Sequence, residues 1–346
     1  MTSGELDRAT GALIGLAAGD AIGFPAMFHR AIAFPARRRW LWTRSLEADQ
    51  ALVNKLQLPH AQSSPLALAF GPTDDAEQAA LAALVLLELG DDPSADELFD
   101  GWWALVEPQQ DRFWGSIADR SAIDNARRGL RSPTTGNDNP HHYDDSSAAR
   151  AVPVGIRWCA QPRKAAAIAR RMAQITNADV GVDGAASFAA AVSVLVGGGE
   201  IATAIECARG EIAEASWIGR CWDRAERIVA DAGDLFAAMP RLNDELAGHG
   251  YSHGNVIAET LPIALIVARE SSGLSQALGL ALMVPKQADT MPALVGALVG
   301  ACSGTSAVPE TWIAALTQLR GVCVPSTKGA RLADLASRLL AHGGDR

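Results

Sequence analysis

Apolar residues recur along most of the chain at three- and four-residue intervals, the spacing that places them on one face of an α-helix. Runs that alternate Val, Ile or Thr with polar residues, as β-strands do, are hard to find, and the good helix formers Ala and Leu dominate. The pattern predicts an all-α protein. Helices are expected near residues 5–18, 75–89, 95–107, 115–130, 163–175, 183–196, 200–215, 217–239, 254–270, 275–283, 291–303, 309–319 and 328–341.

The first expected helix carries Gly11, Gly15 and Gly19 on one strip, because residues four apart lie above one another on a helix. Glycine has no side chain, so the backbone of a second helix can approach such a strip closely. We therefore expect this helix to make a close contact with another helix.

Two stretches lack helical periodicity. Residues 24–70 contain four prolines and form a long irregular segment of the kind that is usually functional or mobile, and residues 131–145 are rich in Pro, Gly, Asn and Asp, as loops are. No internal repeat or domain linker is visible. We expect residues 1–346 to form a compact single-domain helical bundle that includes the irregular segment at about 24–70.

Charge and hydropathy exclude several classes of partner. The 346 residues are 49% hydrophobic and carry a formal net charge of −9, with no compensating stripe of Lys or Arg, so nucleic acid is not expected to bind. The most apolar stretches, 185–198 and 293–302, are too short to cross a bilayer, so no membrane contact is expected. Residues 1–7 are acidic where a signal peptide would be basic, which favours a cytoplasmic protein.

The cysteines do not form a recognisable framework. Their number is odd and no two have Cys-x-x-Cys spacing, which argues against both a disulfide scaffold and a thiolate metal site. We expect reduced, mostly buried thiols at Cys159, Cys207, Cys221, Cys302 and Cys323.

Acids and hydroxyls occur together at the start of two expected apolar helices. Thr73, Asp74 and Asp75 precede the first of these helices, and Asp289 with Thr290 precedes the second. The first turn of a helix has unpaired N–H groups and the positive end of the helix dipole, which favour ionised oxygens there. Because Mg²⁺-type ions prefer oxygen ligands, the two helix starts are candidates for one cation site.

Helix capping is the alternative interpretation of the same residues. Asp74 followed three residues later by Glu77 has the spacing of an N-cap with a capping box. Asp289 or Thr290 before Pro292 is typical of a cap before a helix that begins with proline. Spacing alone does not decide between capping and metal binding.

Seven segments resemble, in chain order, the motifs of the ADP-ribosylglycohydrolase family. They are Asp7-Arg8-Ala9 with Gly15-Leu16-Ala17-Ala18-Gly19-Asp20-Ala21-Ile22-Gly23-Phe24-Pro25, Thr73-Asp74-Asp75, Asp145-Ser146-Ser147-Ala148-Ala149-Arg150-Ala151-Val152-Pro153-Val154-Gly155, Thr176-Asn177, Gly254-Asn255-Val256-Ile257-Ala258-Glu259-Thr260-Leu261, Asp289-Thr290 with Gly296-Ala297-Leu298-Val299-Gly300-Ala301, and Pro309-Glu310-Thr311-Trp312. Each motif is weak alone, but together they run in order over about residues 5 to 320.

The resemblance implies an all-helical domain with a central cleft that holds one or two Mg²⁺ or Mn²⁺ ions and cleaves a glycosidic bond of ADP-ribose. It implies metal ligands at Thr73, Asp74, Asp75, Asp289 and Thr290, with Asp74 and Asp75 as the catalytic carboxylates. The ions would position the ribose hydroxyls and an attacking water. The substrate-binding residues implied in the same way are Asp145, Ser146, Ser147, Asn177 and Met27.

The chain also departs from the family pattern. Gln287 stands where the family has an acid two residues before the Asp-Thr pair, and Met27 stands where it has a glutamate. Since affinity for hard cations follows the charge and number of ligands, we expect at best one firmly held ion. Candidates for the missing acid or base are Glu77, Asp144, Asp145 and His29.

Three functions therefore remain open. The first is a metal-dependent hydrolase of an N- or O-glycosidic bond to ribose or ADP-ribose, acting on a small ribosyl compound or on an ADP-ribosylated protein. The second is a catalytically impaired relative that binds ADP-ribose or a nucleotide, which the departures at Met27 and Gln287 favour. The third is an interaction or immunity protein that makes its contact through residues 24–70.

Overall fold

The computed structural model describes residues 2–23, 71–247, 255–284 and 286–343. Within these ranges every regular element is a helix, and the two β-bridges are isolated residue pairs, so the all-α prediction is confirmed. The helices are α1 (Ser3–Gly23), α4 (Asp74–Leu87), α5 (Ala95–Val106), α6 (Ile117–Arg127), α7 (Thr134–Asn137), α8 (Ser146–Arg157), α9 (Pro162–Ala173), α10 (Val180–Val196), α11 (Ile201–Gly210), α12 (Trp217–Ala232), α13 (Leu235–Leu246), α14 (Ile257–Glu270), α15 (Leu274–Ala281), α16 (Met291–Ser303), α17 (Glu310–Leu316) and α18 (Leu332–His342), with the 3₁₀ helices η2 (Glu107–Arg112), η3 (Thr305–Ala307) and η4 (Pro325–Thr327).

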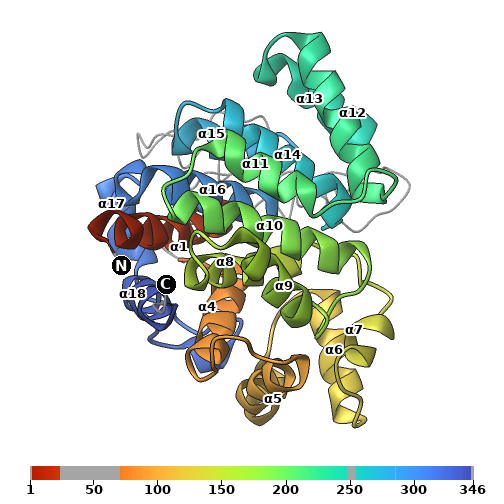
Figure 1. Ribbon diagram of the computed structural model, residues 1–346, viewed down its shortest axis with the longest axis vertical. Coiled ribbons are helices and arrows are strands. Elements are labelled where there is room, and N and C mark those ends of the chain that lie inside the picture. Colours follow the sequence, from red (N-terminus) through yellow and green to blue (C-terminus); the bar gives the residue numbers. More distant parts are fainter. Residues whose placement is uncertain (1, 24–70, 248–254, 285, 344–346) are drawn as a thin grey trace, which may run out of the picture.

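Helices α1 and α16 lie antiparallel in very close contact, as the glycine strip predicts (Figure 1). A Cβ atom at Gly15 would lie 2.1 Å from the carbonyl oxygen of Gly296, and one at Gly11 would lie 2.4 Å from that of Gly300. Only glycine fits at these crossings, because real Cβ atoms do not approach oxygen so closely. The contact brings the C-terminal end of α1 beside the start of α16, next to Asp289.

The core is centred on α10, which packs against α8, α9 and α11 (Figure 1). Nearly all of its residues are buried, including Phe188 and Leu195, so the helix is apolar on every side. This is the character of a helix enclosed by others rather than of a surface helix. Helix α8, which carries the Asp145–Gly155 motif, is held against it.

The segment expected as one helix at 217–239 is two helices. Gly233 ends α12 with φ +79°, the left-handed conformation that glycine adopts most readily. Asp234 then caps α13, since its side chain accepts a hydrogen bond from the N–H of Ala237 at 2.9 Å. Figure 1 shows this α12–α13 hairpin extending away from the rest of the described chain.

The expected helices omit α8 altogether. It contains Pro153, which lacks the N–H needed for a hydrogen bond in mid-helix, and Gly155, a poor helix former. Burial outweighs both penalties here, because all twelve residues of α8 are buried. A short helix, α7, also lies inside the expected loop at 131–145.

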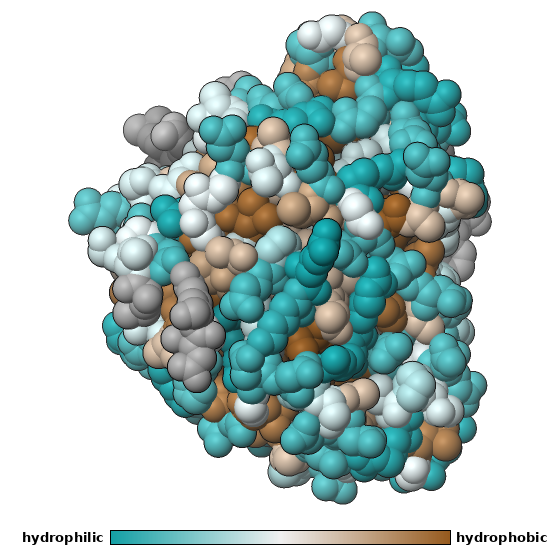
Figure 2. Space-filling model, in the orientation of Figure 1, coloured by the Kyte–Doolittle hydropathy of each residue, from teal (hydrophilic) through white to brown (hydrophobic). Residues whose placement is uncertain are grey.

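The cysteines are free, as expected, but fewer are buried than the sequence indicates. Cys159 and Cys323 are buried, whereas Cys302 is exposed because it lies near the end of α16. No helix among the described residues is long and apolar enough to cross a membrane. Figure 2 shows a mainly hydrophilic face with scattered apolar patches. The single-domain organisation and the central cleft stay predictions.

Candidate active site

Asp20, near the end of α1, fixes the start of α4. Its buried carboxylate accepts hydrogen bonds from the backbone N–H groups of Thr73 (2.8 Å) and Ala76 (3.0 Å). The hydroxyl of Thr73 also donates to Asp20. A residue more than fifty positions away thus caps α4, with the carboxylate at the positive end of the helix dipole.

The capping-box interpretation of Asp74 and Glu77 is therefore wrong. The N-cap of α4 is Thr73, whose side chain makes no capping hydrogen bond within the helix. The Glu77 carboxylate instead accepts three backbone N–H groups of the 322–324 segment, at 3.0, 2.8 and 2.7 Å. The N-cap of α16 is Thr290, and it too makes no side-chain capping bond.

Four carboxylates act on one another where α1, α4 and the start of α16 meet. Burial raises the pKa of Asp20 to about 7, and the negative charge of Asp289 acts in the same direction. Burial raises the pKa of Asp74 well above its ordinary range, and the charges of Asp289 and Asp20 add to this. Burial is also the largest cause of the raised pKa of Asp75, and the negative charges of Asp74 and Asp20 raise it further. Asp20 is bonded to the start of α4, and the Asp289 backbone lies against Gly23 at the end of α1, so these acids share one small region where like charges repel.

The donor set of this region has the chemistry of a divalent-cation site. Carboxylate and hydroxyl oxygens are the ligands that Mg²⁺ and Mn²⁺ prefer, and a cation would relieve the repulsion among buried carboxylates. As the side chains are placed, no group of three or more His, Cys, Asp or Glu in the described part of the chain is arranged to hold an ion. The carboxylate and hydroxyl oxygens are of the chemical kind that such an ion binds. As placed, these side chains do not surround one common ion position.

Gln287, which the resemblance aligns with an acid of the family, is completely buried and hydrogen-bonded at both ends of its amide. Its Oε1 atom accepts from the backbone N–H groups of Asn255 (2.9 Å) and Val256 (3.3 Å) and lies 3.0 Å from the hydroxyl oxygen of Thr260, while its Nε2 atom donates to Glu259. The N–H donors on one side and the carboxylate on the other fix the orientation of the amide. Gln287 therefore joins the start of α14 to the turn before α16.

Asn255 links Gln287 to Asp289, one of the four carboxylates. Its backbone has φ +69°, a conformation that Asn tolerates better than most residues. Its Nδ2 atom donates to Oδ2 of Asp289 at 3.2 Å. Gln287 holds the Asn255 backbone and the Asn255 side chain donates to Asp289, so the two residues link the start of α14 to that carboxylate.

Comparison with known proteins identifies the family of this chain. The family description "ADP-ribosylglycohydrolase" matches residues 1–346. The chain belongs to the ADP-ribosylglycohydrolase family. A solved structure titled "ADP-ribosylglycohydrolase-related protein complex" covers 99% of this chain and 100% of its own, with a TM-score of 0.63 and 20% sequence identity. At that identity the likeness supports the shared fold alone. A search of curated proteins finds no match.

Two of the expected substrate-binding residues of this family member are buried and bonded within the protein. The Ser147 hydroxyl donates to the carbonyl oxygen of Gly181 at 2.8 Å. The Asn177 side chain donates to the carbonyl oxygen of His142 and to Oδ1 of Asp144, both at 3.1 Å. In this arrangement Ser147 links α8 to the start of α10, and Asn177 holds the segment at residues 142–144. Their assignment to substrate stays a prediction.

Asp145 and Ser146 lie beside them. Thr260 donates its hydroxyl to Oδ2 of Asp145 at 2.6 Å, which links α8 to α14. The Ser146 hydroxyl donates to Asp144 at 2.7 Å and lies 3.3 Å from the hydroxyl of Ser116. Ser146 retains 7% exposure whereas Asp145 has none, so Ser146 is the better placed of the two to meet a ligand. Met27 and His29 lie outside the described residues.

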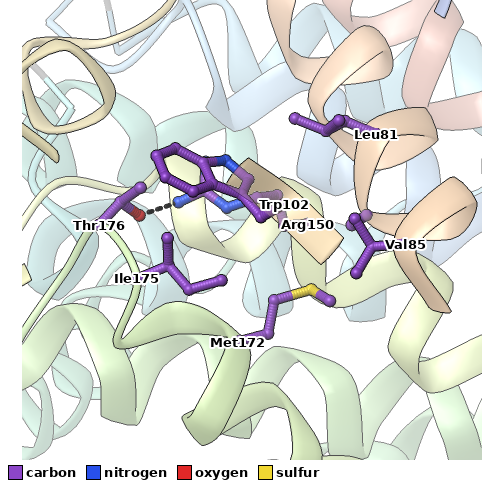
Figure 3. A pocket seen from close by; sticks show the side chains of 8 residues that line it. Leu81, Val85, Trp102, Arg150, Met172, Ile175 and Thr176 are labelled. Atoms are coloured by element: carbon purple, nitrogen blue, oxygen red, sulfur yellow. Dashed lines mark hydrogen bonds between the residues drawn. The ribbon is translucent and has the colours of Figure 1, made fainter. Parts of the chain in front are cut away.

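A buried ion pair supports the same region from behind. Arg150 on α8 and Asp119 on α6 are 2.7 Å apart, with exposed fractions of 3% and 1%. Arg150 also donates to Thr176, and Figure 3 shows this bond beside a cavity of about 10 Å³ walled partly by Trp102. The cavity has room for about one water at most, so it belongs to the packing of α8 rather than to substrate binding.

The sequence predictions did not assign a role to Asp20, Arg150 or Asp119. Asp20 and Arg150 are charged residues inside otherwise apolar stretches, where a charge is costly unless it is paired or hydrogen-bonded, whereas Asp119 lies in a helix with several other charges. That conflict was a signal visible in the sequence. It identifies the residue but not its partner, because the partner lies 31 positions away for Arg150 and 53 for Asp20.

Proposed function

We propose that this family member is a divalent-cation-dependent hydrolase of an N- or O-glycosidic bond to ribose or ADP-ribose. The observation that carries the proposal is that Asp20 is bonded to the start of α4, which carries Asp74 and Asp75, while the Asp289 backbone lies against the end of α1. The pKa values of Asp20, Asp74 and Asp75 are raised accordingly. A chain that needed these acids only for helix capping would not require four in one place. Family members are glycohydrolases that act on ADP-ribosylated substrates.

In this proposal Thr73, Asp74, Asp75, Asp289 and Thr290 hold Mg²⁺ or Mn²⁺. The bound ion would supply a water of lowered pKa and positive charge beside the ribose. Asp74 and Asp75 orient that water, and they are kept in place by the Asp20 cap on α4. Asn255 orients Asp289. Because the Gln287 oxygen already accepts from two backbone N–H groups within the protein, we expect one firmly held ion.

Among the candidates that the structure describes, Asp144 is the best placed for the missing acid. Glu77 is held by three backbone N–H groups far along the chain, and the Oδ2 atom of Asp145 is bonded to Thr260. Asp144 is buried beside Ser146, and burial followed by the charge of Asp119 raises its pKa. A carboxyl group that retains its proton at higher pH can deliver that proton to a leaving group.

The neutral Gln287 side chain, which is hydrogen-bonded within the protein, also favours a second function. If the neutral amide leaves too little negative charge to hold an ion, the same site would bind ADP-ribose without cleaving it. This candidate predicts ligand affinity that is unchanged by chelators, whereas the hydrolase requires the ion.

The test is a mass-spectrometric hydrolysis assay with ADP-ribosyl-arginine, ADP-ribosyl-serine, ADP-ribose and simple ribonucleosides, each with Mn²⁺ and with chelator. Asp74→Asn removes one ligand charge, and Asp111→Asn makes the same change at an exposed site. We expect ion-dependent release of a ribosyl product that is lost in Asp74→Asn and retained in Asp111→Asn. Binding of ADP-ribose with no product from any substrate would favour the second function.

A further inference from the structure

The α12–α13 hairpin contains a groove that the proposed active site does not use. Its volume is about 550 Å³, within the range of pockets that hold small molecules. It is lined by Trp217, Arg220, Cys221, Asp223, Arg224, Arg227, Glu245 and Leu246. The site carboxylates lie on α1, α4 and the turn before α16, so none of the residues that line the groove is one of them.

Three arginines face this groove from one side of α12. Arg220, Arg224 and Arg227 are spaced by four and three residues, which places them along one helix face. Arg224 is paired with Glu245 at 3.2 Å. In the described ranges neither Arg220 nor Arg227 forms an ion pair. They donate instead to the backbone carbonyls of residues 215 and 223. Although the whole chain has a net charge of −9, the guanidinium groups of Arg220 and Arg227 therefore form a local region of positive charge without ion-pair partners among the described residues.

Trp217 lines the same groove with its aromatic ring. Its side chain is 39% exposed, and its ring lies 6.2 Å from the ring of Tyr143, centroid to centroid. A partly exposed indole ring that is held by a tilted contact with a neighbouring ring can stack against a planar ring. The groove thus offers a planar apolar surface and, one helical turn away, guanidinium groups.

We propose that this groove binds a nucleoside phosphate, with the base against Trp217 and the phosphates on Arg220 and Arg227. Guanidinium groups match phosphate oxygens through paired hydrogen bonds, and aromatic rings stack on bases. The proposal does not rest on the proposed function, because no residue of the groove belongs to the carboxylate cluster.

Cysteine alkylation in the intact protein gives a local test. Cys221 lines the groove and is partly buried, whereas Cys302 is exposed at the end of α16 and serves as an internal control. We expect ADP to slow the alkylation of Cys221 at least fivefold without changing that of Cys302. No change at saturating ADP would overturn the proposal, as would protection by an oligoglutamate peptide without protection by ADP.

Charge reversal separates binding in the groove from binding elsewhere. The double variant Arg220→Glu/Arg227→Glu should abolish the protection of Cys221 by ADP, whereas Arg163→Glu/Arg338→Glu, which reverses two exposed arginines elsewhere, should retain it. Both variants are compared with wild type by circular dichroism to confirm folding. Pyrophosphate and adenosine, tested singly, should each protect less than ADP. Equal protection in the two double variants would contradict the assignment.

Discussion

The α1–α16 pair and the α12–α13 hairpin are built on opposite principles. Between α1 and α16, backbone touches backbone at Gly15 and Gly296, and no side chain can be added. In the hairpin, long charged side chains such as Arg224 and Arg241 reach Glu245 across exposed surface. The first contact has a single register, whereas the second can rearrange at little cost.

The fixed register of α1 against α16 matters for the carboxylates at the ends of these helices. Asp20 lies one residue after Gly19, and Asp289 directly precedes the N-cap of α16, so the register of the glycines also fixes the separation of these two acids. Close-packed interiors resist small shifts. Nothing in the hairpin demands such accuracy, and a groove for a flexible ligand can be built there from side chains alone.

The largest expected effect comes from adding one methyl group to the glycine contact. A Cβ atom at Gly296 would lie 2.0 Å from the carbonyl oxygen of Gly15, so Gly296→Ala must separate the two helices. We expect a loss of about 3 kcal/mol or more in the free energy of unfolding, measured with urea. Gly279→Ala in α15 is the control, because a Cβ atom there meets nothing within 4 Å and Ala is the better helix former. Equal stability of the two variants would refute the close contact.

Removal of the Asn255 amide should affect ion binding without affecting the fold. Asn255→Gly keeps the left-handed backbone that φ +69° requires but deletes the hydrogen bond to Asp289. We expect the affinity for Mn²⁺ to fall about tenfold, as is usual when a residue that orients a metal ligand is lost. Calorimetric titration measures this affinity, and urea unfolding shows whether stability is preserved. Unchanged affinity would mean that Asn255 does not position Asp289.

The buried acid beside Ser146 gives a prediction about pH. Because the pKa of Asp144 is raised in the folded state, the native protein holds this proton more tightly than the unfolded chain does. That contribution to stability is lost as the pH rises above the ordinary Asp value of 3.8 through the raised value. Asp144→Asn should therefore gain stability relative to wild type as the pH rises through this window. Parallel stability curves for the two proteins would contradict the raised pKa.

The smallest effect is expected in the hairpin. Phe236 on α13 is 67% exposed, so Phe236→Ser removes little buried surface. We expect the free energy of unfolding to change by less than about 0.5 kcal/mol, as for most surface substitutions. Thermal unfolding of the variant measures this directly. A loss comparable to that of Gly296→Ala would show that the hairpin is packed as tightly as α1 and α16.

The sequence predicts the fold well because most of its signals are local. The apolar spacing identifies most helices, the range 291–303 agrees with α16 at both ends, and the glycine strip correctly predicts a close helix contact. The helix predictions fail where the local sequence disfavours or interrupts a helix differently from what tertiary packing requires. Pro153 conceals α8, whose burial outweighs the missing hydrogen bond, and Gly233 divides a helix whose apolar spacing continues past it.

The site is predicted only in part, for a different reason. Thr73, Asp74 and Asp289 can be proposed from their positions at helix starts, since that signal is local. The cap by Asp20 and the commitment of Gln287 to the start of α14 depend on which residues meet across tens of positions in the chain. Spacing carries no such information, so the capping box at Glu77 was a reasonable but wrong interpretation.

The central claim is that the converging carboxylates form a divalent-cation site. Titration with Mn²⁺, followed by the electron paramagnetic resonance of the free ion, measures this in the wild type, Asp74→Asn and Asp111→Asn. We expect about one tightly bound ion per chain in the wild type and in Asp111→Asn, and binding at least about a hundredfold weaker in Asp74→Asn, where a charged ligand is lost. A wild-type protein that is folded yet binds no ion, or an Asp74→Asn variant that binds as the wild type does, would contradict the claim.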